Sequence, residues 1–471
     1  MLYKMIKSIL KKPRNLPFVG YFRQDILIIL NNGARDMHGL FLVYMYIKYA
    51  LNLKVKIKSV LSMRRYWIKL YCPKVVIHIS IDHPSTVEDY KMLGGMRSIC
   101  LMSPTEVFAT PDPKDVISKY DYKELIYGAL LPGERTKDIL IENDKIFPNQ
   151  AFVVGYPTLD WSNPELRRYF LSQRDFKRKN NIAETHKIIL LISSFSVADM
   201  NFSKWEKDYF NLPKSLTKKR VEDFSTDAKE MRIRAISDIS QLLADNPNWH
   251  LIIRKHPFEN SSVYEKILSG QNQITYAPAE MDIHDLLSVS DVVVHWNSTV
   301  SVQAWIFDKP TILLHLEKQF FLNKEEEASE NGNYICFNKQ QLNIALSEAL
   351  DKGTPFEQIK TRKEFLNNWF DGADGKSSVK IANLVARLAK QDIHVSSKLS
   401  VIDIIRGIRD LIKYKSLFTF IRILRLLNLK PKISAFMKTQ KQYDYFNLDF
   451  FGIRMENRLK NIVPELFNKS S

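Results

Sequence analysis

Two short stretches of the sequence place polar and cationic side chains directly after apolar runs of strand length. The first is WHLIIRKHP, residues 249–257, and the second is DVVVHWNSTV, residues 291–300. Three basic and three hydrogen-bonding side chains follow these runs: Arg254, Lys255 and His256 after the first, and Asn297, Ser298 and Thr299 after the second. Cationic groups beside the unpaired N–H groups of a helix start bind phosphate. The pattern therefore predicts a phosphate site where two strands end.

Three more side chains are candidates for the same donor site because they lie in turns or in the following helix: Ser194, Glu280 and Gln303. Ser194 belongs to a hydroxyl-rich turn after the apolar run KIILLI, and hydroxyl and backbone N–H groups in such a turn can line a phosphate. An ordinary turn at the end of a strand explains the same serines equally well.

The elements that must position these residues are strands of a parallel sheet. Apolar runs of about four to six residues bounded by polar turns are typical of strands buried on both faces. Ligands of open α/β sheets bind at the carboxyl edge of the strands. We expect the strands that end near Arg254 and His295 to be neighbours. His256 and Ser298 would then hold the diphosphate or monophosphate of a nucleotide-activated donor together.

Strand-like and helix-like segments alternate along most of the chain, which predicts an α/β fold with mostly parallel sheets and right-handed crossovers. A chain of 471 residues is too long for one ordinary core, so we expect two Rossmann-like doubly wound domains that face a cleft. The expected parts are a basic amphipathic segment, an acceptor domain, a linker, a nucleotide-donor domain, a closing helix and a basic helical tail: residues 1–20, 21–160, 161–186, 187–374, 375–392 and 393–471.

The composition is that of a globular protein, with 45% hydrophobic residues. The three cysteines are scattered and form no CxxC pair, which supports neither a disulfide framework nor a zinc site and favours a reducing, cytoplasmic compartment. No run reaches the roughly 18 to 20 apolar residues that span a bilayer. The first residues, MLYKMIKSILKKPR, lack the long apolar core and cleavage site of a signal peptide.

The formal net charge of +17 implies an anionic partner or a solvated basic face. Residues 395–471 hold 15 Lys and Arg against 6 Asp and Glu, so this tail supplies +9 of the total. Residues 398–432 alternate apolar and basic side chains with helical spacing, which is typical of a helix lying on an anionic membrane. Packing of this helix on the protein core is the equal alternative. No RNA-binding signature appears, so nucleic acid is not expected as a partner.

Four motifs resemble bacterial glycosyltransferases of the GT-B architecture that build surface carbohydrates such as capsule and lipopolysaccharide. They are IIRKHP, SDVVVHWNSTVSVQAWIFDKPTI, the late DGKSS before an amphipathic helix, and VVGYPTLD. The HP motif and the downstream Ser/Thr motif are shared with bacterial sialyltransferases, Kdo transferases and CDP-polyol phosphotransferases. The resemblance extends over roughly residues 20–392. Because those relatives often use cytidine-activated donors, it favours a CMP- or CDP-linked donor.

The resemblance implies that His256 contacts the donor phosphate and that Ser298 and Thr299 hold phosphate or ribose oxygens. A glutamate is common in such transferases where this chain has Gln303, one turn into the helix. Glutamine still forms hydrogen bonds, but it is neutral and has fewer acceptor sites for the ribose hydroxyls.

The catalytic base is expected from strand ends of the first domain, since one carboxylate or imidazole must deprotonate the acceptor hydroxyl of an inverting enzyme. Glu106 in SPTE matches the placement of an acidic residue in related transferases and is the first choice, and Asp36 on a glycine turn is the second. Asp82 and His83 are further candidates. Acids at strand ends also cap helices. No DxD-like pair follows a strand, so neither a metal nor another cofactor is expected.

The leading hypothesis is a glycosyltransferase that moves a sugar from a nucleotide donor to a lipid-linked or growing surface polysaccharide, on the inner face of the plasma membrane. A CDP-polyol phosphotransferase or a nucleotide-sugar epimerase on the same fold is the alternative. The third hypothesis is a non-catalytic protein that binds membrane or nucleic acid.

Overall fold

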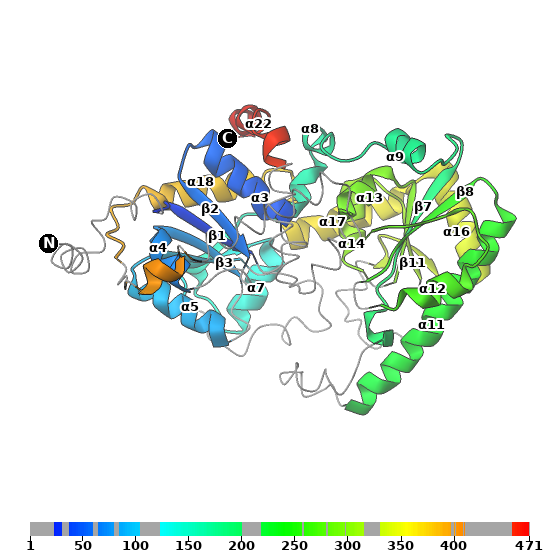
Figure 1. Cartoon of the computed structure of the whole chain (residues 1–471), viewed down its shortest axis with the longest axis horizontal. Coiled ribbons are helices and arrows are strands. Elements are labelled where there is room, and N and C mark those ends of the chain that lie inside the picture. Colours follow the sequence, from blue (N-terminus) through cyan, green and yellow to red (C-terminus); the bar gives the residue numbers. More distant parts are fainter. Residues whose placement is uncertain are drawn as a thin grey trace. The chain divides into compact units, whose positions relative to one another are not determined.

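The computed structural model describes residues 23–30, 37–59, 65–79, 84–103, 123–199, 218–256, 259–278, 281–296, 298–314, 330–396, 400, 402–407, 409 and 455–470. These residues form two compact units. The first unit contains the described residues up to Asp160 and those from Trp369 onward, and the second unit contains those from Trp161 to Asn368. Each unit is built on one six-stranded sheet, and Figure 1 shows both.

The sheet of the first unit is parallel throughout, with the strand order β2-β1-β3-β4-β5-β6. Its strands are β1 Ile26–Leu30, β2 Val55–Ser59, β3 Val75–Ile79, β4 Ile99–Ser103, β5 Gly128–Leu131 and β6 Ala151–Val153. All five residues of β1 are buried, which is expected of a central strand covered by helices on both faces.

Helices cover both faces of this first sheet (Figure 1). They are α3 Met37–Met45, continued by a π-helical turn Tyr46–Ala50, then α4 Arg65–Tyr71, α5 Pro84–Gly95, α7 Glu134–Glu142 and α18 Ser377–Ala389. Helix α18 packs beside α3 although it lies far along the chain. It is strongly amphipathic, and its apolar residues such as Ile381 and Val385 are buried.

The sheet of the second unit is also parallel, with the order β12-β11-β10-β7-β8-β9. Its strands are β7 Lys187–Ile192, β8 Trp249–Arg254, β9 Ile274–Tyr276, β10 Val292–His295, β11 Thr311–Leu314 and β12 Tyr334–Cys336. Its helices are α8 Pro164–Arg167, α9 Gln173–Lys179, α11 Lys218–Asp245, α12 Ser261–Ile267, α13 Ile283–Val289, α14 Val300–Ile306, α16 Lys339–Lys352 and α17 Phe356–Phe370, whose last two residues belong to the first unit. Two six-stranded parallel sheets with covering helices confirm the predicted fold class.

The expectation that β8 and β10 are neighbours is wrong, because β7 lies between them and pairs with both. Ile192 at the end of β7 pairs with Arg254 on one side and with His295 on the other. Strand order depends on which crossovers the chain makes, and the sequence pattern of a strand does not encode this. The ends of all three strands still meet at one edge of the sheet.

Residues 161–186, expected as a linker, form α8 and α9 and pack against the second unit. The Leu171 N–H donates to Asp285 Oδ1 at 2.8 Å, and an Arg167 guanidinium nitrogen donates to Asp308 Oδ2 at 2.7 Å. Trp161 is fully buried against the ring of Phe170. This segment is therefore an ordered part of the second unit.

Parts of the basic tail pack on the first unit. Met455, Leu459 and Val463 are fully buried, and α22 Val463–Ser470 contacts the π-helical turn, where the Phe467 and Tyr46 rings lie 5.8 Å apart. Between residues 398 and 432 the structure describes only 400, 402–407 and 409. Among the described residues, none of the helices combines the length and apolarity needed to cross a bilayer.

Candidate functional site

The candidate site in the second unit consists of the loops that follow β7, β8 and β10. Parallel strands all present their carboxyl ends at the same edge, and the register places Arg254, Ile192 and His295 side by side there. His256, Ser194 and Ser298 follow these positions by two, two and three residues, respectively. The segments that carry these residues therefore begin at the edge of the sheet where ligands of open α/β sheets generally bind.

The loop after β8 is held by hydrogen bonds that leave its basic groups close to the sheet edge. The Arg254 guanidinium donates to the Pro278 carbonyl oxygen at 2.6 Å, and Lys255 Nζ donates to the Glu259 carbonyl oxygen at 3.1 Å. Both side chains are partly buried. Two of the three predicted cations therefore also stabilise the loop that carries them.

His256 is half-buried, and this burial lowers the pKa of its imidazole below the usual value of 6.5. Its backbone N–H donates to Glu259 Oε1 at 3.4 Å, and its carbonyl oxygen accepts the Glu259 N–H at 3.0 Å. Without a bound anion the imidazole is thus neutral near pH 7, and a neutral imidazole carries one N–H donor. An approaching phosphate would raise its pKa again, because a nearby negative charge favours the protonated form.

The serine turn after β7 contributes one side chain to the interior and one to the edge. Ser193 is buried, and its hydroxyl donates to Glu259 Oε2 at 2.6 Å and also contacts the Tyr264 hydroxyl. Ser194 is only partly buried. Of these two serines, Ser194 is therefore the one available to line a bound phosphate.

The loop after β10 is anchored on a buried histidine. His295 Nε2 and Asn333 Oδ1 lie 3.2 Å apart, and the Ser298 backbone N–H donates to His295 Nδ1 at 3.5 Å. The acceptor role of Nδ1 implies the neutral tautomer with its proton on Nε2. Burial lowers the pKa of His295 to about 4, so the ring stays neutral at physiological pH.

The start of α14 is capped by Ser298 and not by the Thr299 side chain. Thr299 occupies the N-cap position, but its side chain makes no capping hydrogen bond, whereas Ser298 Oγ accepts the Val300 N–H at 3.4 Å. Gln303 is partly buried, and its Oε1 has no hydrogen-bond partner among the described residues. Trp296 stacks on Phe195 with 4.5 Å between ring centroids, which assigns it to the core rather than to a nucleotide base.

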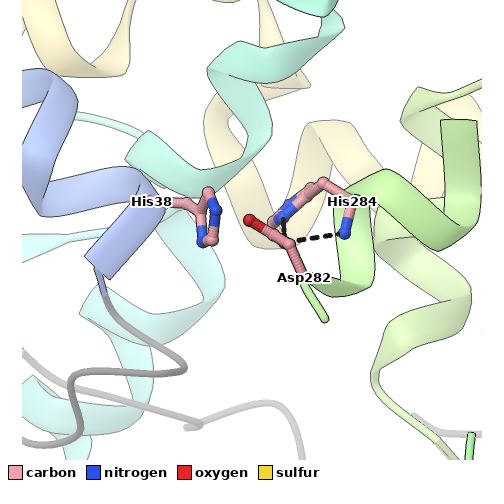
Figure 2. Close-up of side chains that lie close together, drawn as sticks. All are labelled: His38, Asp282 and His284. Atoms are coloured by element: carbon pink, nitrogen blue, oxygen red, sulfur yellow. Dashed lines mark hydrogen bonds and ion pairs between the residues drawn. The ribbon is translucent and has the colours of Figure 1, made fainter. Parts of the chain in front are cut away.

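Six of the residues predicted from sequence lie outside the described residues: Asp36, Asp82, His83, Glu106, Glu280 and Asn297. Neighbouring Asp282 is described and begins α13. Its Oδ1 accepts the His284 backbone N–H at 2.9 Å and lies 3.2 Å from His284 Nδ1, as Figure 2 shows. Asp282 is therefore a helix cap, which is a common role for an acid before a helix.

Two residues that the sequence analysis did not select turn out to support the candidate site, Glu259 and His295. Glu259 lies three residues after the histidine of the HP motif, which is the only local signal that could have drawn attention to it. His295 ends an apolar run and looks like part of a strand. The hydrogen bonds of both residues cross between elements, so local sequence spacing does not reveal them.

The first unit has its own pocket at the carboxyl edge of its sheet, with roughly 430 Å³ of empty space, part of which is open solvent. Among its lining residues are Gly39, Ser103, Leu130, Tyr156, Thr158 and Ile381. None of the residues that line the described part of this pocket carries a charge. Such a lining suits a neutral hydroxylated group better than a phosphate.

The sequence matches the model of a known protein family. The family model described as CDP-glycerol:poly(glycerophosphate) glycerophosphotransferase matches residues 130–387, more than half of the chain. This range contains the whole sheet of the second unit and all but the last two residues of helix α18. A search of curated protein sequences found no match.

Solved structures resemble this chain in fold at low sequence identity. MnaA from S. aureus in complex with UDP aligns with a TM-score of 0.52 and 14% identity, over 80% of this chain and 100% of MnaA. A variant of the wall teichoic acid polymerase TagF soaked with CDPG aligns with a TM-score of 0.50 and 13% identity, over 78% of this chain and 89% of that one. The shared feature is the GT-B-like fold with two Rossmann-like domains.

Proposed function

Because the chain belongs to the CDP-glycerol:poly(glycerophosphate) glycerophosphotransferase family, we propose that it transfers a polyol phosphate from a CDP-linked donor to a hydroxyl group of a surface polymer. Glycerol phosphate from CDP-glycerol is the specific donor group that we propose. This function corresponds to the alternative hypothesis from the sequence rather than to the leading hypothesis of sugar transfer. The family match across the donor-binding unit is the observation that carries the proposal.

The proposed reaction transfers one phosphoryl group together with the glycerol that it bears. The acceptor hydroxyl oxygen attacks the phosphorus that bears the glycerol, and the bond from that phosphorus to the bridging oxygen breaks. CMP leaves with the bridging oxygen, and the acceptor proton passes to a base. Negative charge grows on the departing CMP phosphate, so groups that stabilise an anion at that oxygen lower the barrier.

His256 is the residue that we propose to contact the donor diphosphate, because it lies half-buried at the sheet edge between Lys255 and the buried Glu259. Its neutral imidazole offers an N–H donor and takes up a proton as the anion binds. Ser194, Ser298 and Thr299 would surround the phosphates with hydroxyl and backbone N–H groups, and Arg254 and Lys255 would add positive potential. Gln303 is proposed to contact the ribose, and Asn297 and Glu280, outside the described residues, are further proposed donor-binding residues.

A carboxylate of the first unit is the proposed base, with Glu106 as first candidate and Asp36 as second. Both lie outside the described residues and follow predicted strands of the first sheet. The uncharged pocket lined by Ser103 and Thr158 is the proposed binding place for part of the polyol acceptor. We propose that the reaction needs no metal ion or other cofactor, since basic and N–H groups can stabilise the leaving phosphate.

Residues 398–432 are proposed to bind the anionic inner face of the plasma membrane, where a polymer acceptor would be anchored. Within the described part of this range, Ile402 and Ile405 are 58% and 60% exposed, and Arg406 and Arg409 are also exposed. Apolar side chains beside arginines favour an anionic lipid surface. Co-sedimentation with phosphatidylglycerol vesicles tests this, and binding that survives the double change Ile402→Ser and Ile405→Ser would contradict it.

The activity itself is tested by release of CMP. The purified full chain is incubated with CDP-glycerol and a glycerophosphate oligomer, and CMP and the extended oligomer are measured by chromatography. A parallel panel replaces CDP-glycerol with CDP-ribitol, a CMP-linked sugar or a UDP-linked sugar. We expect turnover with a CDP-polyol and loss of turnover in His256→Ala. Turnover of a nucleotide sugar in place of CDP-polyols would restore the hypothesis of a glycosyltransferase.

A further inference from the structure

Glu259 forms hydrogen bonds with the backbone of His256 through both its own backbone and its side chain. The Glu259 N–H donates to the His256 carbonyl oxygen at 3.0 Å, and Glu259 Oε1 accepts the His256 N–H at 3.4 Å. The two interactions bind both backbone groups of His256 to one residue. The direction in which the imidazole leaves the backbone is therefore set by Glu259.

The Glu259 carboxylate is itself fixed by two other elements. Its Oε2 accepts the hydroxyl of Ser193, which follows β7, at 2.6 Å and also accepts the hydroxyl of Tyr264 from α12. Glu259 is only 4% exposed and Tyr264 only 1%. The carboxylate therefore joins the ends of β7 and β8 to α12 and cannot move without breaking buried hydrogen bonds.

A buried carboxylate is costly for the protein, and an apolar side chain of similar size would tie the loops together at a lower desolvation cost. The charge therefore calls for a role beyond packing. Among the described residues, Lys255 and Arg254 act on His256, whereas the Tyr264 hydroxyl contacts the Glu259 carboxylate and Arg232, paired with Asp199, acts on Glu259 from α11. Of the described charged groups that act on His256, Glu259 is negative and Lys255 and Arg254 are positive.

We propose that Glu259 is a positioning residue for the donor site, which aims the His256 imidazole at the donor phosphate and keeps it able to take up a proton there. This rests on the proposed function, in which His256 contacts that phosphate. Burial and the two neighbouring cations oppose protonation of His256, whereas the Glu259 carboxylate favours it. The loop thus carries two basic side chains that disfavour protonation of His256 and one buried carboxylate, Glu259, that favours it.

The test compares Glu259→Gln with the matched variant Tyr264→Phe. Both remove part of the same hydrogen-bond network, but only Glu259→Gln removes the charge. The pKa of His256 is measured in the free full chain by NMR with histidine labelled at Cε1, and its resonance is assigned by its absence in His256→Gln. The affinity for CDP-glycerol and the values of kcat and KM are then measured from pH 5.5 to 8.5.

We expect the His256 pKa to fall by about one unit in Glu259→Gln, because loss of a neighbouring negative charge disfavours the protonated imidazole. The pH midpoint of donor affinity should move to lower pH by a similar amount, and kcat should fall more than KM rises. Tyr264→Phe should lower the melting temperature but leave both the His256 pKa and the pH midpoint of donor affinity unchanged. Equal shifts of the His256 pKa in both variants, or no shift in Glu259→Gln, would contradict the proposal and show that Glu259 has only a structural role.

If Glu259→Gln does not fold, the variant Glu259→Asp provides a second measurement. Glu259→Asp keeps the charge but withdraws it from the His256 N–H by one methylene, so we expect kcat to fall while the His256 pKa stays within about 0.3 units of the wild type. Wild-type kcat in Glu259→Asp would contradict the positioning role. The NMR measurement uses no donor, so it separates failure of this proposal from failure of CDP-glycerol as the substrate.

Discussion

The carboxylate of Asp160 accepts the backbone N–H of Ser378 at 2.6 Å, although 218 residues separate the two in sequence. Its second oxygen accepts the Ser377 N–H at 3.0 Å. The motif VVGYPTLD thereby caps helix α18, which begins in the motif DGKSS. Gly155 of the first motif has φ +81°, and a Cβ there would come within 2.2 Å of Ser377 Oγ. Two motifs of the predicted resemblance therefore form one joint that fastens α18 to the first unit.

Replacement of Asp160 by alanine should destabilise the first unit. The change removes the cap of α18 and leaves two buried N–H groups without their acceptor, so we expect a loss of about 2 to 3 kcal/mol in the free energy of unfolding. Urea unfolding followed by circular dichroism measures it. Asp138→Ala, on the exposed side of α7, is the matched control and should stay within about 0.5 kcal/mol. Equal stability of the two variants would contradict the capping role.

The same carboxylate should make the stability of the first unit depend on pH. Burial raises the Asp160 pKa from 3.8 to about 6, so the folded state keeps the proton at pH values where the unfolded state has lost it. Stability therefore falls by about 3 kcal/mol as pH rises from about 4 to about 6. Asp160→Asn cannot titrate and should lack this loss. Melting temperatures of wild type and Asp160→Asn across this range check the difference, and parallel curves would refute it.

His295 should produce the opposite dependence in the second unit. Its pKa is lowered from 6.5 to about 4 by burial, so the folded state binds fewer protons than the unfolded state between these values. Stability that is present above pH 6.5 is therefore lost as pH falls towards 4, by about 3 kcal/mol. His295→Gln should lose stability at pH 7.5 but show a flatter decline on acidification. A decline in stability as steep as in the wild type would show that the pH dependence does not come from His295.

The two sheets were predictable from the sequence because their strands are apolar runs bounded by polar turns, as in KIILLI and DILIIL. The order of the strands was not, since nothing in the run around β7 indicates that it lies between β8 and β10. That the strands before His256 and Ser298 end at one edge of the sheet followed from their being parallel. Glu259 was missed because Ser193, which binds it, lies 66 residues away.

The pocket of the first unit gives a prediction about the acceptor. Ser103 ends β4 and lines this pocket. Ser103→Trp should fill much of the space and raise KM for a glycerophosphate oligomer by about tenfold, because a bulky ring excludes the acceptor. The affinity for CDP-glycerol should not change, since the proposed donor residues belong to the second unit. A parallel rise in donor Kd would indicate that the pocket serves the donor or that the variant is misfolded, and circular dichroism separates these results.

The central claim is that the edge formed after β7, β8 and β10 binds the donor diphosphate through His256. Calorimetric titration of the full chain with CDP-glycerol, for wild type, His256→Ala and the exposed control His394→Ala, tests it most directly. We predict at least tenfold weaker binding in His256→Ala, about 1.4 kcal/mol or more, and unchanged binding in His394→Ala. Binding in His256→Ala as tight as in the wild type, with the fold intact, would contradict the claim.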